Sequence, residues 1–237
     1  LSSDKKFPQP SCKFMYLFIG LEGYKGKLPE FNTWIYPHGD YDELENVLED
    51  SPDGLIDVNG EIISDRAYFV ASGSAKSGDW PEGKHSIVVL CNAIPHWYTQ
   101  WDGTRHKDRE RIQDYIEWKE AFGKTMLQNG LLKYIPDVED YIVHQSVGTP
   151  LSTQHFIGSR AGEVYGISPE PKRWSHKDLL PRTTVNGLFL TGQDIVTAGI
   201  AGAFSSAELT ANVVVGYGSL SDIFSQGDLI ADLKKNE

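Results

Sequence analysis

The chain has 237 residues, of which 40% are hydrophobic and 23% are charged, a composition typical of a folded globular protein. Its 33 Asp and Glu residues outnumber its 22 Lys and Arg residues, which gives a formal net charge of -11. This acidic balance argues against broad contact with a phosphate backbone, so nucleic acid is not an expected partner. The chain has two cysteines, Cys12 and Cys91, in no CxxC pair, and no disulfide partner is implied.

The first part of the chain carries short strand patterns separated by turns. Residues 14–21 (FMYLFIGL) predict a buried strand, because the run is short, aromatic-rich and closed by a glycine. The acidic run 40–53 predicts an amphipathic helix with a solvated face rather than a calcium loop. Further short strands are expected at residues 33–36, 55–58, 61–63, 68–71 and 86–91, with a hairpin turn at Asn59 and Gly60. These patterns predict a largely antiparallel sheet.

Two aromatic patterns follow. Tyr115, Trp118, Phe122 and Met126 recur at spacings of three and four, which predicts one long helix within 107–128. Gly130 would then serve as its C-terminal cap. The aromatic residues of segment 94–101 (IPHWYTQW) leave two alternatives open, a lipophilic pocket lining or ordinary core.

The C-terminal part is the most informative stretch. Residues 187–191 predict an apolar strand, which is followed by Gly192, Gln193 and Asp194, by a Gly/Ala loop at 197–202, and by a helix over 203–215. Such a strand, loop and helix present backbone N–H groups and a positive dipole end to a ligand. The alternative is that the small residues merely let the helix pack tightly. Asp194 favours the ligand, because a carboxylate there needs hydrogen-bond donors that ligand hydroxyl groups can supply.

Several common kinds of site are not indicated. The seven histidines show no HxH or HExxH spacing, so no metal site is expected. There is no GxSxG elbow and no P-loop. No polar residue is uniquely placed, so no catalytic acid or base is assigned.

The sequence of residues 187–203 (GLFLTGQDIVTAGIAGA) resembles the C-terminal flavin-binding motif of the FAD-dependent phytoene desaturase and carotenoid isomerase superfamily, and within it the retinol saturase branch. Supporting likenesses occur in the same order at residues 74–81, 95–101, 149–153 and 165–166. The likeness covers most of the chain, and it is loosest before Phe14 and around the acidic helix.

The resemblance implies a fold and a division of the chain. The expected class is α/β, with an α+β substrate lobe that has a mixed, largely antiparallel sheet. The chain would be the C-terminal part of a glutathione-reductase and amine-oxidase-like FAD fold, a Rossmann-like NAD(P)-binding architecture. Residues 1–178 would form part of the substrate-binding lobe, and residues 179–237 would complete the FAD-binding domain.

The resemblance also implies a cofactor site. The cofactor would be FAD, with NAD(P)H as an expected electron donor. Asp194 would hydrogen-bond the ribityl chain, and the helix start would direct its dipole at the flavin. The implied cofactor-binding residues are Gly192, Gln193, Asp194, Gly199, Ile200, Ala201, Gly202 and Ala203.

The implied activity is that of an oxidoreductase that saturates, desaturates or isomerises carbon–carbon double bonds of a retinoid-like or carotenoid-like isoprenoid. A lipophilic substrate favours peripheral membrane contact in an intracellular compartment of endoplasmic reticulum or plastid type. The first residue is Leu1 and the family's GxGxxG is absent, so the chain is expected to be a fragment that is inactive by itself. The alternatives are a non-catalytic lipophile-binding module and a flavin amine oxidase of the same superfamily.

Overall fold

The structure is a computed structural model that describes residues 9–57, 59–63, 66–78, 80–174, 176 and 178–216. The chain divides into two compact units. We call Cys12–Val164 the sheet unit, and Leu1–Ser11 together with Tyr165–Glu237 the helix unit. The predicted boundary after residue 178 therefore falls inside the helix unit. The substrate-binding and FAD-binding roles assigned to the two parts stay predictions.

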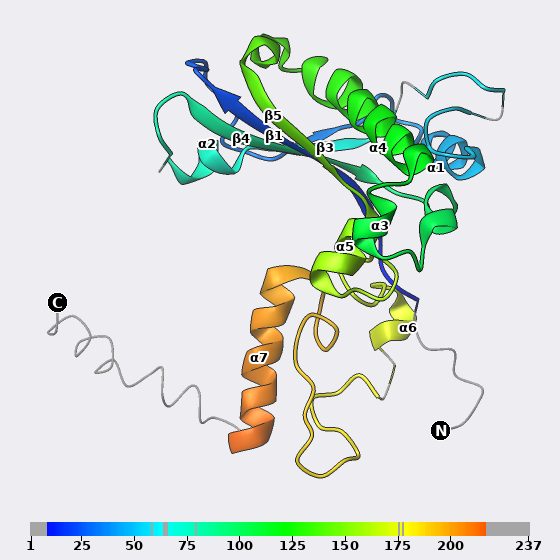
Figure 1. Ribbon diagram of the computed structural model, residues 1–237. Coiled ribbons are helices and arrows are strands. Elements are labelled where there is room, and N and C mark those ends of the chain that lie inside the picture. Colours follow the sequence, from blue (N-terminus) through cyan, green and yellow to red (C-terminus); the bar gives the residue numbers. More distant parts are fainter. Residues whose placement is uncertain are drawn as a thin grey trace, which may run out of the picture. The chain divides into compact units, whose positions relative to one another are not determined.

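The sheet unit is built on a five-stranded sheet in which every neighbouring pair is antiparallel (Figure 1). In the order of the sheet, the strands are β2 (Thr33–Ile35), β3 (Tyr68–Ala71), β4 (Lys84–Asn92), β1 (Phe14–Glu22) and β5 (Ile142–Gly148). This confirms the predicted mixed α/β class and the largely antiparallel sheet. That the chain completes an FAD fold stays a prediction.

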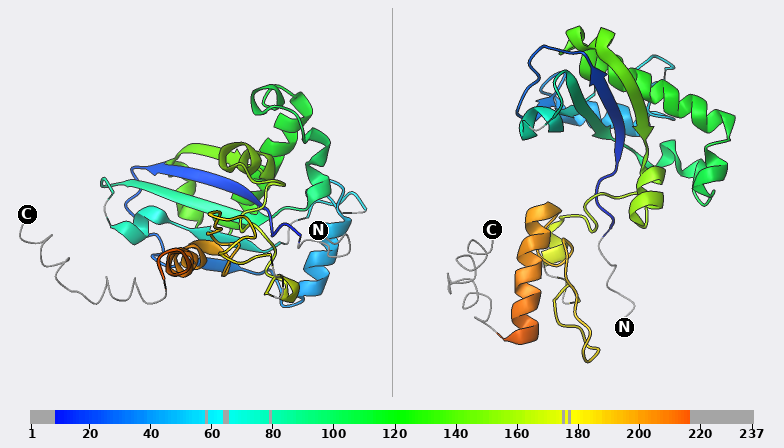
Figure 2. Two further views of the ribbon diagram at one scale, coloured as in Figure 1. Left: turned by 90° about the horizontal axis from the view of Figure 1, so that it is seen from below. Right: turned by 60° about the vertical axis from the view of Figure 1, so that its left-hand side comes forward.

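Alternation along β1 separates the two faces of the sheet. Met15, Leu17 and Ile19 are buried, and Leu17 lies opposite Val89 of β4. The helix α4 (Gln113–Thr125) covers this face (Figures 1 and 2), and it continues into a π-helical segment, η3 (Met126–Leu132). The side chains that alternate with Met15, Leu17 and Ile19 along β1 belong to the other face of the sheet. On that face, the ring of Phe18 is 45% exposed. The hydrophobic core of the sheet unit therefore lies between the sheet and α4.

The predicted single helix over 107–128 is wrong at both ends. A separate short helix, α3 (His106–Arg109), precedes α4, because Arg109 turns inward and donates hydrogen bonds to the carbonyl oxygens of Thr104 and Leu151. Gly130 is not a cap but a buried residue inside η3. A Cβ atom at Gly130 would lie 2.9 Å from Cδ1 of Tyr68, so the glycine allows close packing on β3.

Shorter elements complete the sheet unit: α1 (Tyr41–Asp50), α2 (Gly73–Ser77), α5 (Pro150–Ile157) and the 3₁₀ segments η1 (Pro95–Trp97), η2 (Thr99–Trp101) and η4 (Pro136–Tyr141). The predicted acidic helix is confirmed as α1, which Asp40 caps by accepting the N–H of Glu43 at 3.0 Å. The predicted hairpin is present as one bridge between Ile56 and Ile62, while Val58, like Asp79 of the family likeness, lies outside the described residues.

The aromatic residues of segment 94–101 belong to the core. Trp97, Tyr98 and Trp101 are 1%, 2% and 8% exposed. The indole Nε1 of Trp97 donates to the carbonyl oxygen of Ser51 at 3.1 Å, which satisfies its buried polar atom. The pocket alternative is therefore wrong for these side chains, and the core alternative is confirmed.

Replacing Trp97 with phenylalanine should lower the free energy of unfolding by about 2 kcal/mol, from lost packing and a lost hydrogen-bond donor. The matched control is Trp34→Phe, because Trp34 is 63% exposed and should tolerate the change. Chemical denaturation of both variants measures the difference. Equal destabilisation of the two variants would contradict the assignment of Trp97 to the core.

The helix unit contains α6 (Pro171–Trp174) and α7 (Gly199–Val215). The predicted strand at 187–191 is wrong, because the described residues of this unit provide only isolated bridges, Pro10 to Ile167 and Arg182 to Phe189, and no ladder. The predicted helix is confirmed, but it begins at Gly199 rather than Ala203, so residues 199–202 form its first turn. Among the described residues, no helix is both long enough and apolar enough to cross a membrane.

Candidate functional site

The turn formed by Gly192, Gln193 and Asp194 is fastened to α7. The N–H of Gly192 donates to Oγ of Ser206 at 2.9 Å. The side-chain oxygen of Gln193 accepts the N–H of Gly199 at 3.0 Å, in place of a cap from Ala198, which has no polar side chain. The predicted turn and helix start are therefore brought together by direct hydrogen bonds.

Asp194 already has a donor within the chain. Its Oδ1 atom accepts the backbone N–H of Ile167 at 2.8 Å. Gly166 lies against the same carboxylate, so a side chain at that position would overlap it. The sequence argument that Asp194 needs a ligand for its hydrogen bonds is thus weakened, because the backbone supplies one of them.

Sequence reasoning missed Arg173, which joins the same segments. Its side chain is buried, and its guanidinium group donates to the carbonyl oxygen of Ile167 at 2.8 Å and to that of Gln193. Arg173 and Asp194 therefore hold both backbone groups of Ile167 beside the turn. No pattern in the sequence could reveal this, because the partners are backbone atoms of other segments.

The remaining predicted residues form the first turn of α7. Ile200 is 80% exposed, and Ala201 is also exposed, whereas Ala203 is partly buried. Gly202 is buried, and a Cβ atom there would overlap the carbonyl oxygen of Thr197. The small size of Gly202 is thus needed for packing within the unit, which was the alternative reading of the glycine-rich stretch.

The helix α7 has an unusual distribution of side chains. Its buried positions are the small or polar residues Gly202, Ser206 and Thr210. The hydroxyl of Thr210 donates to the carbonyl oxygen of Leu190 at 2.9 Å. In contrast, large apolar side chains such as Phe204, at 74%, are exposed. Within this unit, α7 packs through its small face and leaves its apolar face open.

The sheet unit holds a second candidate site, a pocket of about 460 Å³ beside β5, α3 and α5. Its polar side chains include Glu110 and Lys119, which form an ion pair at 2.8 Å, and His106. The imidazole rings of His106 and His155 stack with their centres 4.4 Å apart. Desolvation, followed by the charge of His155, lowers the pKa of His106.

Protonation of His106 should destabilise the sheet unit. An unfolded histidine has a pKa of about 6.5. The pKa of His106 is lower than this in the folded protein, despite the opposing charge of Glu110. The contribution of the neutral imidazole to folding stability is therefore complete above about pH 6.5, and it is lost as the pH falls towards the folded pKa. Melting temperatures between about pH 5 and 8 should therefore fall less steeply towards low pH in His106→Gln than in the parent. The exposed residue His38 provides the control His38→Gln, which should keep the parent slope. An unchanged slope in His106→Gln would contradict the prediction.

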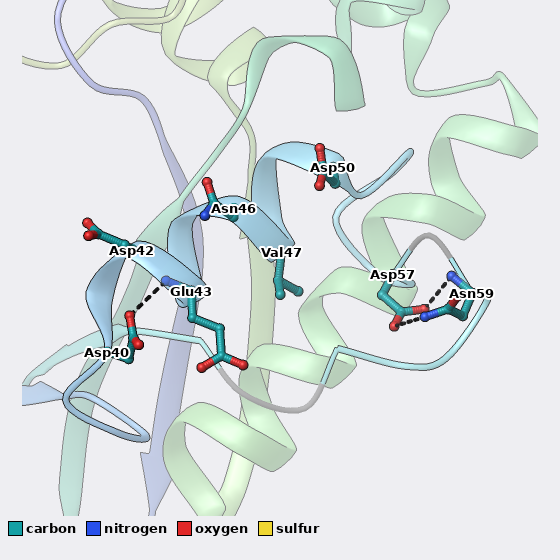
Figure 3. Close-up of a pocket in the computed structure, with 8 residues that line it drawn as sticks. All are labelled: Asp40, Asp42, Glu43, Asn46, Val47, Asp50, Asp57 and Asn59. Carbon is teal, nitrogen blue, oxygen red and sulfur yellow. Dashed lines mark hydrogen bonds between the residues drawn. The ribbon is translucent and has the colours of Figure 1, made fainter.

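An acidic hollow of about 610 Å³ lies between α1 and the turn after Asp57 (Figure 3). Two of its carboxylates serve local structure. Asp40 caps α1, and Asp57 accepts the backbone N–H groups of Glu61 and Asn59 at 2.9 and 2.8 Å, which lowers the pKa of Asp57. In the described part of the chain, no group of three or more His, Cys, Asp or Glu residues is placed to hold a metal ion.

Comparison with known proteins gives three informative relatives. The chain is 34% identical to an all-trans-retinol 13,14-reductase of Danio rerio over 207 residues, which are 84% of this chain and 33% of that protein. It is 27% identical to an all-trans-retinol 13,14-reductase of Macaca fascicularis, over 96% of this chain and 38% of that protein. It is 25% identical to an inactive all-trans-retinol 13,14-reductase of Danio rerio, over 87% of this chain and 34% of that protein.

The chain spans about a third of the length of these relatives. No protein-family model matches it. The similarity nevertheless extends over most of the chain and includes both units. The resemblance stated from the sequence is therefore confirmed: this chain is a homologue of the all-trans-retinol 13,14-reductases, the retinol saturases.

Proposed function

We propose that the chain forms part of an FAD-dependent oxidoreductase that acts on a carbon–carbon double bond of a retinoid-like isoprenoid. The observation that carries the proposal is the 34% identity, over 84% of the chain, to a protein named all-trans-retinol 13,14-reductase. Around the start of α7, Gly192 and Gly199 leave room for a flavin ring. Asp194 and Gly202, in contrast, are already in contact with other parts of the chain.

The start of α7 fits the flavin. Ala198 provides no side-chain cap and Gln193 holds only the N–H of Gly199, so the other first-turn N–H groups and the positive end of the helix dipole remain available to negative charge on a ligand. Gly192 has open space where a Cβ atom would lie. At Gly199, with φ +87°, the nearest atom to such a Cβ would be Cε1 of Tyr165 at 3.9 Å. A flat ring system can therefore approach the backbone at these two positions.

Asp194 fits the ribityl chain less simply. Its Oδ1 atom is held by Ile167, and no described residue donates to its Oδ2 atom. A ligand hydroxyl would therefore have one carboxylate oxygen as its acceptor. Gly202 is packed against the carbonyl oxygen of Thr197, so its small size serves packing within the unit rather than contact with the cofactor.

When bound, FAD would supply the electron-transfer chemistry of the reaction. The chain's own residues would bind and orient it. Arg173 and Asp194 hold the turn in place, Gln193 fixes Gly199, and the start of α7 stabilises negative charge. We assign no proton-transferring residue to the reaction.

The test is expression of the complete gene product, followed by its visible absorption spectrum and by assay of all-trans-retinol consumption with a reductant. Flavin bands and a saturated product are expected. Gly199→Ala should lower flavin content, whereas Gly187→Ala should retain it, because Gly187 has a similar φ of +80° and open surroundings. A folded protein without flavin bands, and with no gain on adding FAD, would refute the proposal.

A second candidate is a non-catalytic lipophile-binding protein. The observation that favours it is the relative named as an inactive all-trans-retinol 13,14-reductase, to which this chain is 25% identical. The same experiment separates the two candidates. Binding of all-trans-retinol without flavin and without a reduced product would support the second.

A further inference from the structure

The proposed function assigns no role to the pocket of about 460 Å³ in the sheet unit. Its volume lies in the range of small-molecule sites. Its lining includes an apolar group of side chains, which we call the apolar end, and a polar group, which we call the polar end. The apolar end is formed by Phe18, Phe156 and Ile157, and the polar end by His106, Glu110 and Lys119.

The polar end is neutral overall but incompletely hydrogen-bonded. Oε2 of Glu110 pairs with Nζ of Lys119 at 2.8 Å. The other carboxylate oxygen, Oε1, and Nδ1 of His106 are shielded from solvent, and neither has a hydrogen-bond partner. Shielded polar atoms without partners are rare in folded proteins, and they often mark a functional site.

The apolar end is left open to solvent. Phe18, Phe156 and Ile157 are 45%, 73% and 76% exposed. The ring of Phe156 contacts the rings of both His106 and His155, with centres 5.3 and 4.8 Å apart. An apolar ligand body lying here would cover these side chains next to the polar end.

We propose that this pocket binds a lipophilic alcohol, with its hydroxyl group between His106 and Glu110. A hydroxyl group donates and accepts at once, so it can donate to Oε1 of Glu110 while accepting from the imidazole of His106. A charged head group gains no counter-ion here, because Glu110 and Lys119 neutralise each other. An ether or aldehyde has no donor for Glu110. The inference rests on the proposed function, because it names which end of the lipophilic substrate the pocket takes.

The distances suit one bridging oxygen. Nδ1 of His106 and Oε1 of Glu110 are 4.0 Å apart, which is too far for a direct hydrogen bond. An oxygen atom about 2.8 Å from each satisfies both. The two side chains are 25% and 32% exposed, and both residues line the pocket.

The test compares two ligands on the complete protein without a reductant. The probes are all-trans-retinol and its methyl ether, whose Kd values are measured by quenching of tryptophan fluorescence. The unmodified protein should bind the alcohol about tenfold more tightly than the ether. His106→Phe keeps a ring against His155 but removes Nδ1, and Glu110→Gln removes the charged acceptor. Both variants should lose most of this preference.

The ratio of the two Kd values is informative even where a variant weakens binding overall, because both ligands meet the same protein. The control is Glu117→Gln, because Glu117 is exposed on α4 and bonds to Gln113, outside the pocket. Its ratio should equal that of the parent. An equal affinity for alcohol and ether in the parent, no binding of either ligand, or a preference that survives both variants would overturn the inference.

The experiment distinguishes failure of this inference from failure of the proposed function. Flavin binding and retinol reduction with an unchanged Kd ratio in both variants would refute this inference alone. Conversely, the expected loss of preference in a protein without flavin or turnover would refute the oxidoreductase proposal and leave the alcohol site standing.

Discussion

Replacing Gly202 with alanine should lower the free energy of unfolding of the helix unit by about 3 kcal/mol, the upper end of the usual overpacking cost. Helix propensity alone predicts the opposite, a gain of about 1 kcal/mol. The steric effect prevails, because the added Cβ atom would overlap the carbonyl oxygen of Thr197. Relief would require the first turn of α7 to move away from Gln193, which holds the N–H of Gly199.

The same change should release the flavin if the proposed function is correct, because the first turn of α7 would no longer keep its position. Thermal unfolding and flavin content of the complete protein are the measurements. Gly73→Ala is the matched control, since the nearest atom to a Cβ there is Oγ of Ser86 at 3.8 Å, an ordinary contact. A Gly202→Ala protein as stable as the control would contradict the packing role given to Gly202.

Sequence patterns identified the central strands of the sheet because alternation there is strict. Met15, Leu17 and Ile19 are buried on one face, as the period of two requires. The strand β5 was missed because it lies at the edge of the sheet and most of its side chains, such as His144 and Gln145, are exposed. Its pairing with β1 depends on residues far away in the chain, which local patterns do not record.

The break between α3 and α4 shows the same limit. Apolar spacing indicates one helix, but the inward turn of Arg109 is stabilised by the carbonyl oxygen of Leu151, a partner from another segment. The apolar run at 187–191 was misread as a strand for a related reason. Its composition indicates burial, and the described residues of the helix unit provide no neighbouring strand.

The candidate cofactor site was predicted in part. Glycines and an acidic residue after an apolar run located the turn of Gly192 to Asp194 and the start of α7, which hydrogen bonds join. The supports Arg173 and Ser206 were missed, because each acts on backbone atoms rather than through a sequence motif. The polar end of the sheet-unit pocket was missed for a different reason: His106 and Glu110 lie four residues apart at α3, and only the fold brings Lys119 of α4 to them.

Replacing Phe204 with glutamine should have opposite effects in two settings. Phe204 is 74% exposed in this chain, on a helix whose buried face is small and polar. A helix that is apolar on its outer face is normally buried against a partner. We expect segments outside this chain to supply that partner. The chain spans about a third of the length of the relative that it matches.

In the isolated chain, Phe204→Gln should therefore raise the soluble yield and reduce the binding of a hydrophobic dye, because an exposed apolar side chain is removed. In the complete gene product it should lower the free energy of unfolding by about 3 kcal/mol, the cost of losing a buried phenylalanine. The neighbouring residue Ser205 is also exposed in this chain and supplies the control, Ser205→Gln. Its effect should be small in the isolated chain. If Phe204→Gln leaves the stability of the complete protein unchanged, the outer face of α7 is not an internal interface, and the idea that this helix completes a larger flavin-binding domain loses its physical basis.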